Sequence, residues 1–325
     1  MKKLVSLAGL VLATAAASAT ASTPQINPEF ARWNQISAAV WPLAQANVEL
    51  CGAAVVPSLG FSVGGSDNNL PLLLGVGEGS PAQAAGLQDF DELVSINGEK
   101  LKTRKLEQVV ERYAEVLVDE AEAGHPLEVV YLRDGVETKA SVTPVQACDF
   151  RVLYVPKPIP STTQGNAVVL GNAIDSYAKT PEQIRAYVSR SVARIILDHQ
   201  GENARRGRGI NLLTGAAGLL TGHNVGITGN AVARFRNAER QDLEQDYLSV
   251  YLLARAGDDV SGITDFWQGV FANMPSNQLL GRALGQSQGS PVRLEELAAA
   301  RDEILAKKQA GEPLLPAGRR AEKDS

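Results

Sequence analysis

The chain contains only two cysteines, Cys51 and Cys148, and they bracket one continuous block of the sequence. A bond between them would close a loop of about a hundred residues, which the chain-entropy model credits with at most roughly 4–5 kcal/mol of stability. The bond would also hold both ends of the block together, so that the block folds as one unit. The alternative is that both cysteines are buried free thiols. Whether a disulfide persists depends on the cellular compartment of the protein.

The first residues predict export from the cell. Lys2 and Lys3 form a positive start, residues 4–17 are mostly apolar and carry no charge, and small residues follow in overlapping Ala-x-Ala patterns at 17–21. This order is typical of a signal peptide, here residues 1–21, although a buried N-terminal helix is an alternative. We expect an exported protein, periplasmic in a bacterial cell, in which a disulfide bond persists.

Composition argues against several classes of protein. Of 325 residues, 44% are hydrophobic and 21% are charged, which indicates a globular chain of about two domains. The net charge is −5 and there is no long basic tract, so nucleic acid is a poor partner. Outside the signal peptide no uninterrupted apolar stretch of about eighteen residues occurs, so we expect no transmembrane span in the mature chain.

The block between the cysteines is predicted to contain strands, turns and short helices. Ser80 and Pro81 are an N-cap and a first helical residue, and Gly86 ends that helix. Residues 92–96 alternate as a strand and lead into Asn97-Gly98, a strong hairpin signal. The remaining predicted elements are an amphipathic helix at 105–123 and two strands, 127–132 and 138–142, joined at Asp134-Gly135.

This order of elements resembles a PDZ domain of the bacterial, HtrA-like type. The resemblance covers residues 51–148. Ser58-Leu59-Gly60-Phe61 matches the carboxylate-binding loop of the family, and its helix and strand signature is matched by Gly79-Ser80-Pro81, Ala85-Gly86-Leu87 and Asp91. Phe90 departs from the pattern, because the family usually has glycine at this position.

The PDZ resemblance implies peptide binding. The backbone N–H groups of residues 58–61 would converge on a terminal carboxylate, Gly60 would let the ligand approach, and the peptide would add as an extra strand. Leu59 and Phe61 would line the pocket for the last side chain of the peptide. The implied partners are C-terminal or extended segments of envelope proteins. The alternative is a PDZ fold that only spaces or docks the next domain.

The second half is predicted to be mainly helical. Thr180 and Pro181 open a first helix, and two more helices are predicted at 237–256 and 292–309. The segments PEQIRAYVSRSVARIILDH and RQDLEQDYLSVYLLARAGDDVSGITDFW are similar to the two active-site helices of zinc metallopeptidases of the HtpX and CAAX-prenyl-protease (gluzincin) type. This resemblance implies a metallopeptidase-like domain at 149–316 and a short tail at 317–325.

The expected fold class is therefore α+β. A small PDZ β-barrel or sandwich with helices would precede the mainly α-helical metallopeptidase-like domain. Residues 22–50 are expected to form an N-terminal helical segment that packs on one of the two domains. The glycine-rich segment 205–230 has two possible roles. It either contacts a membrane surface or partner, or packs small residues over the region that corresponds to the substrate cleft of the resembled peptidases.

The zinc chemistry of the resembled peptidases is missing from the second half. Their H-E-x-x-H motif places two imidazoles on one zinc ion and a glutamate that activates water. Here the window reads Arg190-Ser191-Val192-Ala193-Arg194, with arginine at both ligand positions and serine at the base position. Asp242 occupies the third ligand position and Asp246 that of a retained aspartate. Because a guanidinium stays protonated and cannot ligate zinc, we expect no catalytic residue, metal or cofactor at this site.

Alternatives remain open for this degenerate site. A zinc site rebuilt from His199, His223 and Asp242 would make the chain an active hydrolase. Arg190 and Arg194 form either a solvated helix face or a replacement for the charge of the metal. In the second case, at least one of them pairs with a carboxylate of the next helix, namely Asp242, Glu244 or Asp246.

The whole sequence predicts an exported peptide-binding or adaptor protein. It would combine a PDZ module with a peptidase-like domain that has lost its catalytic activity. The competing functions are an active metallopeptidase with a rearranged site and a structural envelope protein that binds no ligand.

Overall fold

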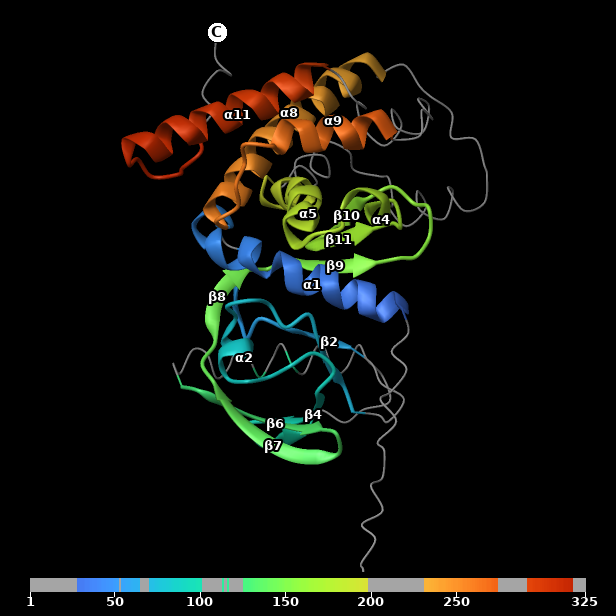
Figure 1. Cartoon of the computed structure of the whole chain (residues 1–325), viewed down its shortest axis with the longest axis vertical. Helices are drawn as coiled ribbons and strands as arrows, with labels where there is room; N and C mark the ends of the chain where they lie inside the picture. Colours follow the sequence, from blue (N-terminus) through green and yellow to red (C-terminus); the bar gives the residue numbers. More distant parts are fainter. Residues whose placement is uncertain are drawn as a thin grey trace, which may run out of the picture.

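The protein has an α+β fold, as a computed structural model shows, with a β-sheet in one part and helices gathered in the other (Figure 1). The predicted α+β class is therefore confirmed. The structure describes residues 28–52, 54–64, 70–100, 113, 116, 125–197, 231–273 and 291–317, without the side chains of 231–239. The predicted signal peptide, most of the predicted helix at 105–123 and the glycine-rich segment 205–230 lie outside these residues.

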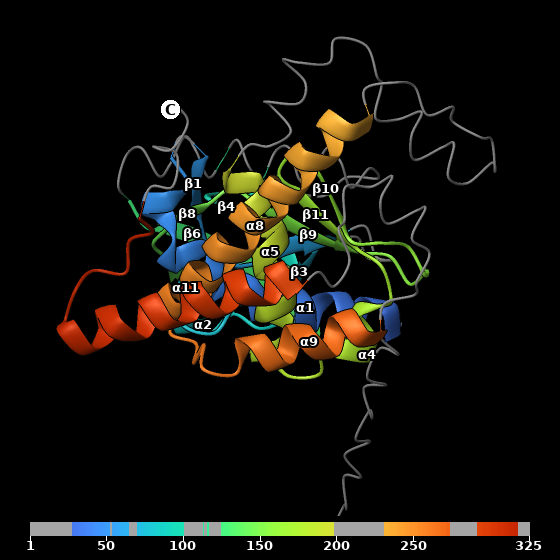
Figure 2. The same ribbon diagram turned by 90° about the horizontal axis from the view of Figure 1, so that it is seen from above.

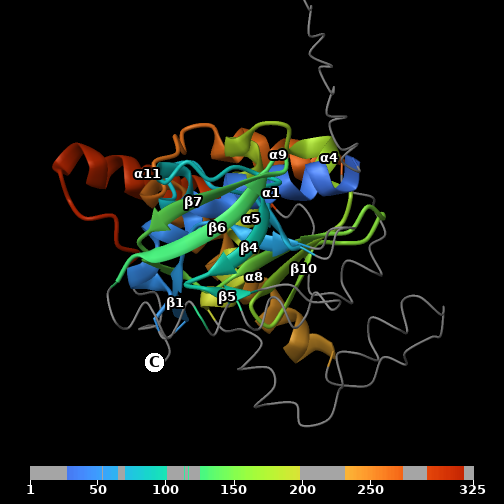
Figure 3. The same cartoon turned by 90° about the horizontal axis from the view of Figure 1, so that it is seen from below.

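The first part is built on a six-stranded sheet, which Figure 3 shows from below. Its strand order is β2 (Ser62–Gly64), β3 (Leu72–Leu74), β4 (Glu92–Ile96), β6 (Leu127–Arg133) and β7 (Val136–Val142), with β5 (Glu99–Lys100) paired to β4. A separate two-stranded sheet pairs β1 (Val55–Ser58) with β8 (Val145–Cys148). All of these pairs are antiparallel, and the short helix α2 (Pro81–Ala84) follows β3.

The local turn and cap signals of this part form as predicted. Ser80 caps α2 through its side chain. Asn97 and Gly98 have φ angles of 48° and 78°, and β4 pairs with β5 across them. Asp134 and Gly135 have φ angles of 53° and 77° between β6 and β7. Two successive positive φ angles are what a two-residue hairpin requires, and Asn-Gly and Asp-Gly adopt them most readily.

The six-stranded sheet buries a continuous hydrophobic core. The residues with no exposed surface there include Leu59, Leu73, Leu93, Ile96 and Leu127. Tyr113 and Val116, from the segment predicted as a helix, are helical and are buried in the same core. Their spacing of three residues places both side chains on one helix face, which explains why both reach it.

The second part packs helices on a small sheet (Figure 2). The sheet has the order β10 (Thr162–Gln164), β11 (Ala167–Leu170) and β9 (Arg151–Tyr154), with β9 parallel to β11. The helices are α4 (Ile174–Tyr177), α5 (Pro181–Ile196), α8 (Ala231–Arg255), α9 (Ile263–Asn273) and α11 (Pro291–Ala310). Thr180 caps α5, as its sequence predicts, and the structure shows that the cap is a capping box with Gln183. No helix within the described ranges combines the length and the apolar character that crossing a membrane requires.

Helix α1 (Pro28–Ala46) lies between the two parts (Figure 1). Ile36 and Leu43 are fully buried in the core of the helical part. Trp41 lies against the loop after β3, so close that a Cβ added to Gly77 would overlap its side chain. The prediction that the N-terminal segment packs on one domain is therefore wrong, because α1 contacts both parts.

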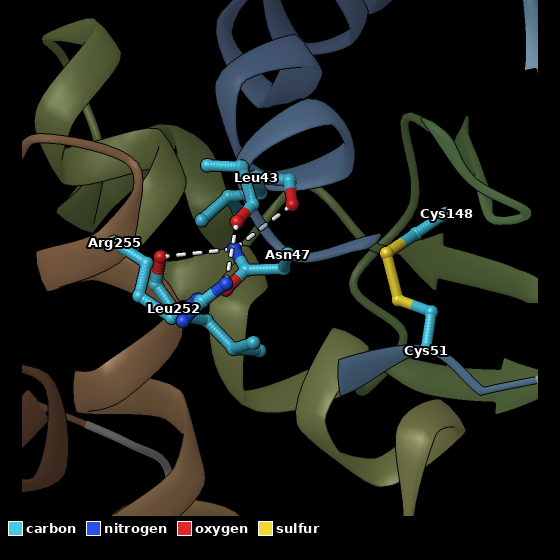
Figure 4. The surroundings of a disulfide bond; sticks show 7 residues. Leu43, Asn47, Cys51, Cys148, Leu252 and Arg255 are labelled. Atoms are coloured by element: carbon cyan, nitrogen blue, oxygen red, sulfur yellow. Dashed lines mark hydrogen bonds between the residues drawn. A yellow bond between two sulfur atoms is a disulfide. The ribbon is translucent and has the colours of Figure 1, made fainter. Parts of the chain in front are cut away.

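Cys51 and Cys148 form the predicted disulfide bond, with their Cα atoms 5.7 Å apart (Figure 4). Next to it, Asn47 is fully buried and donates from Nδ2 to the carbonyl oxygens of Leu43 at 3.0 Å and Leu252 at 3.1 Å. The Leu252 carbonyl belongs to α8. The end of α1 is therefore fixed to α8 close to the bond that ties the chain to β8.

Candidate functional site

Arg190 of α5 connects two carboxylates of α8. Its Nη2 donates to Asp242 Oδ1 at 2.6 Å, and its Nε donates to Asp246 Oδ1 at 2.6 Å. The exposed fractions of these side chains are 15% for Arg190, 5% for Asp242 and 0% for Asp246. The predicted pairing of an arginine with the carboxylates of the second helix is therefore confirmed, and Arg190 is the arginine that makes it.

The helical spacing of both segments explains this contact. Asp242 and Asp246 are four residues apart on α8 and therefore lie on the same helix face. Helix α5 packs along α8, and its Val188 and Val192 are buried in the shared core on either side of Arg190. A guanidinium is a planar fork with several N–H donors, so one side chain can reach both carboxylates at once.

Arg293 of α11 completes the ion-pair cluster, and the sequence analysis did not identify it. It is 2% exposed, and it donates to Asp246 from Nε at 2.6 Å and from Nη2 at 2.8 Å. Its guanidinium carbon also lies 4.3 Å from the centre of the Phe271 ring. The only signal in the sequence is its place in the first turn of a helix, where a cation opposes the helix dipole and needs a compensating partner.

The charges in this cluster depend on one another. Burial alone would lower the pKa of Arg190, but the charges of Asp246 and Asp242 outweigh burial and raise that pKa above its ordinary value. Burial, together with the charge of Arg190, lowers the pKa of Arg293, and Asp246 opposes this shift. Both guanidinium groups remain protonated at any physiological pH, so Asp246 lies between two permanent cations.

Arg194 and Ser191 lie close to Arg190 on α5, and all three residues are partly buried. The Nε atom of Arg194 is buried and has no hydrogen-bond partner among the residues that the structure describes. Burial and the like charge of Arg190 lower the pKa of Arg194, and Asp242 opposes them in part. Arg194 therefore lies within the field of the cluster without forming an ion pair among the described residues.

The described residues bring together no alternative set of metal ligands. Across the described ranges, no three His, Cys, Asp or Glu side chains lie close enough to hold a metal ion. His199 and His223, the two histidines of the possible rebuilt site, lie outside the described residues. His125 is exposed. Glu244, the third carboxylate considered for the arginines, lies 3.8 Å from Arg240 of its own helix.

The loop from Ser58 to Phe61 lies between β1 and β2. Gly60 has a φ angle of 82°, and its N–H donates to Ser58 Oγ at 3.1 Å. The carbonyl oxygen of Leu59 accepts from Ala82 N–H of α2, and that of Gly60 accepts from Gly77 N–H in the loop after β3, at 2.9 Å each. Strand β2, which follows the loop, is an edge strand in the described order of its sheet. The structure therefore places the predicted loop immediately before a strand at the sheet edge.

The two apolar residues predicted to line a peptide pocket are both buried. Leu59 has no exposed surface, and Phe61 is 8% exposed. The Phe61 ring stacks on Tyr113 with 5.4 Å between ring centres. The loop and the segment 105–123 therefore meet through this pair, although they lie far apart in the sequence.

A double-mutant cycle tests the energetic role of Asp242. We expect Asp242→Ala to lower the free energy of unfolding by more than about 1 kcal/mol, because Arg190 then loses one of two buried partners. Replacing Arg190 by alanine as well should recover part of that loss, as coupled neighbours do. Urea unfolding measures all four proteins of the cycle.

A matched control for this cycle is Glu128→Ala, which breaks the pair with Lys139. Those side chains are 52% and 61% exposed, so the change should cost less than about 1 kcal/mol. If Asp242→Ala costs no more than this control, the buried pairing contributes nothing beyond a surface pair.

Comparisons with known proteins assign no role to these residues. No protein-family model matches the sequence, and a search of curated proteins found no match. The support for a function therefore comes from the residues and their geometry.

Proposed function

We propose that this chain is an exported, periplasmic peptide-binding adaptor, made of a PDZ-like module and a peptidase-like domain without zinc chemistry. The observation that carries the proposal is the position of Arg190. From α5 it donates hydrogen bonds to Asp242 and Asp246 of α8, and these are the two helices that resemble the active-site helices of zinc peptidases. A guanidinium supplies positive charge there but cannot ligate zinc. The disulfide bond agrees with an exported protein.

The proposed domain binds or docks proteins without cutting them. Metal-dependent hydrolysis needs a Lewis acid that polarises the carbonyl group and a base that activates water. Arg190 is already held by two carboxylates, and Ser191 offers a hydroxyl group at the position of the general base. Neither group supplies a metal ligand or a base of the required strength.

Two observations support the PDZ-like module. Phe90, which stands where the resembled family usually has glycine, has a φ angle of 71°. Glycine adopts this left-handed conformation without strain, so the backbone keeps the shape that the family pattern implies. The loop at 58–61 also precedes β2 at the end of the sheet order, the place where an added peptide strand would pair.

The test is the binding of short peptides to the full chain, measured by fluorescence anisotropy. A library of peptides with free C-termini is compared with the same peptides amidated at the C-terminus. We expect the free form to bind at least about tenfold more tightly, because hydrogen bonds to a charged carboxylate are worth roughly 1.5–3 kcal/mol. Equal binding of both forms would contradict carboxylate recognition, and no binding at all would favour a structural envelope protein.

Ser58→Ala is the most informative variant for this test. The Ser58 hydroxyl accepts a hydrogen bond from the Gly60 N–H, which a carboxylate ligand would need as a donor. Removal of this hydroxyl frees the N–H, so the peptide affinity should be equal or higher. Ser261→Ala, at an exposed hydroxyl bonded to Asp259, is the matched control and should change nothing. A substitution at Gly60 is less useful, because its φ angle is 82° and an added Cβ would overlap Ser80.

A further inference from the structure

The cluster between α5, α8 and α11 has more guanidinium groups than carboxylates among the described residues. Its cations are Arg190, Arg194 and Arg293, and its anions are Asp242 and Asp246. Asp246 accepts from Arg190 and from both donors of Arg293, while Asp242 accepts from Arg190. Arg194 is left without an ion pair in the part of the chain that the structure describes.

Arg194 is placed where a positive charge is unfavourable. It lies four residues after Arg190, so the two guanidinium groups share one face of α5. Its Nε is shielded from solvent and has no acceptor within the described ranges. Burial and the charge of Arg190 both lower its pKa. A partly buried cation next to another cation costs free energy unless an anion compensates it.

We propose that the partly exposed side chain of Arg194 binds an oxyanion, either a carboxylate or a phosphate group. The side chain of Arg194 is partly exposed, so a small anion can reach it from solvent. The planar fork of arginine binds both kinds of oxyanion with two parallel hydrogen bonds. This site uses none of the residues of the loop at 58–61, so it goes beyond the proposed function.

The first test compares the stability of the wild-type chain and Arg194→Met in chloride, phosphate and acetate at equal ionic strength. A bound anion stabilises the folded state in proportion to the logarithm of its concentration above the dissociation constant. We expect a larger rise of the urea midpoint with phosphate or acetate in the wild type than in Arg194→Met. Arg151→Met, which removes an exposed arginine of β9, should respond as the wild type does.

The same variant separates a ligand site from a structural ion pair. In chloride alone, Arg194→Met should be at least as stable as the wild type, because it removes a cation without a partner and keeps an apolar stem of similar length. General salting effects of phosphate act on all three proteins alike, so the difference between them reports the site.

The second test measures binding directly by titration calorimetry of the full chain with sodium phosphate and with sodium acetate. Arg194→Lys keeps the charge without the fork and should bind more weakly than the wild type. Tighter binding of phosphate would point to phosphorylated ligands, and tighter binding of acetate to carboxylate ligands. Either result supports the site.

The proposal is overturned by any of three results. The first is that neither anion binds to the wild type. The second is that phosphate and acetate raise the urea midpoint equally in the wild type and in Arg194→Met. The third is that Arg194→Met loses much of its stability or does not fold. The last would show that Arg194 is a structural cation. Binding of free C-terminal peptides to Arg194→Met should be unchanged, so failure of this site is distinguishable from failure of the proposed function.

Discussion

Asp246→Asn is expected to lower the free energy of unfolding by about 3–5 kcal/mol, which is the usual cost of breaking a buried ion pair from one side. Asp246 has no exposed surface and accepts hydrogen bonds from both Arg190 and Arg293. The neutral amide keeps the shape of the side chain, but it removes the only carboxylate that the described contacts place on Arg293. Urea unfolding of the purified variant measures the loss.

The control for Asp246→Asn is Asp302→Asn. Asp302 pairs with Arg301, but its side chain is 65% exposed, so this change should leave the free energy of unfolding close to that of the wild type. If both variants lose the same amount, the cluster between α5, α8 and α11 does not behave as a buried ion-pair network.

Removal of the disulfide bond by Cys51→Ala with Cys148→Ala is expected to cost about 2–5 kcal/mol. The bond links cysteines that are 97 residues apart in the sequence. A disulfide that closes a long loop lowers the entropy of the unfolded chain most, so the unfolded chain gains much entropy when this bond is removed. The expected result is a lower urea midpoint for the double variant. The wild type unfolded in the presence of a strong thiol reductant should lose a similar amount.

A double variant with unchanged stability under oxidising conditions would contradict this expectation. It would mean that the contacts next to the bond, including the buried hydrogen bonds of Asn47, hold the region without the covalent link.

The elements that the sequence predicts correctly are those with short-range causes. Ser80 and Thr180 cap helices whose first residues are proline, and each cap needs only its own neighbours. Asn97-Gly98 and Asp134-Gly135 turn because these residues tolerate positive φ angles. Boundaries without such a signal are less accurate, and α8 begins at Ala231 instead of residue 237.

The contacts that the sequence misses depend on the tertiary structure. Arg293 lies in a helix rich in Ala, Glu and Arg, and nothing near it in the sequence shows that Asp246 will be its partner. Helix α1 carries buried residues on more than one face, because it packs against two parts of the fold. A pattern with no single apolar face does not show how many partners a helix has.

The arginine pairing is an intermediate case. The proposed resemblance to the zinc peptidases aligns Arg190 with one ligand position and Asp242 with another, and therefore predicts that the two residues lie close together. The same reasoning applied equally to Arg194, and only the packing of α5 on α8 shows that Arg190 is the residue that reaches both carboxylates. Sequence position therefore predicted the site and left the choice between its two arginines open.

In the proposed function, α5 and α8 hold a peptidase-like site in which arginine stands at the zinc-ligand positions. This claim is tested by the zinc content of the variant Arg190→His, Ser191→Glu, Arg194→His, Asp242→Glu, measured next to the wild type after dialysis against buffered zinc. In this variant Asp246 loses Arg190 but still accepts both hydrogen bonds from Arg293, so this fully buried carboxylate keeps a cationic partner.

We expect stoichiometric zinc in the four-residue variant, because two imidazoles at i and i+4 and a glutamate from the next helix form a zinc site. We expect none in the wild type, together with no cleavage of casein. Stoichiometric zinc in the wild type, or a folded variant that binds none, would contradict the account.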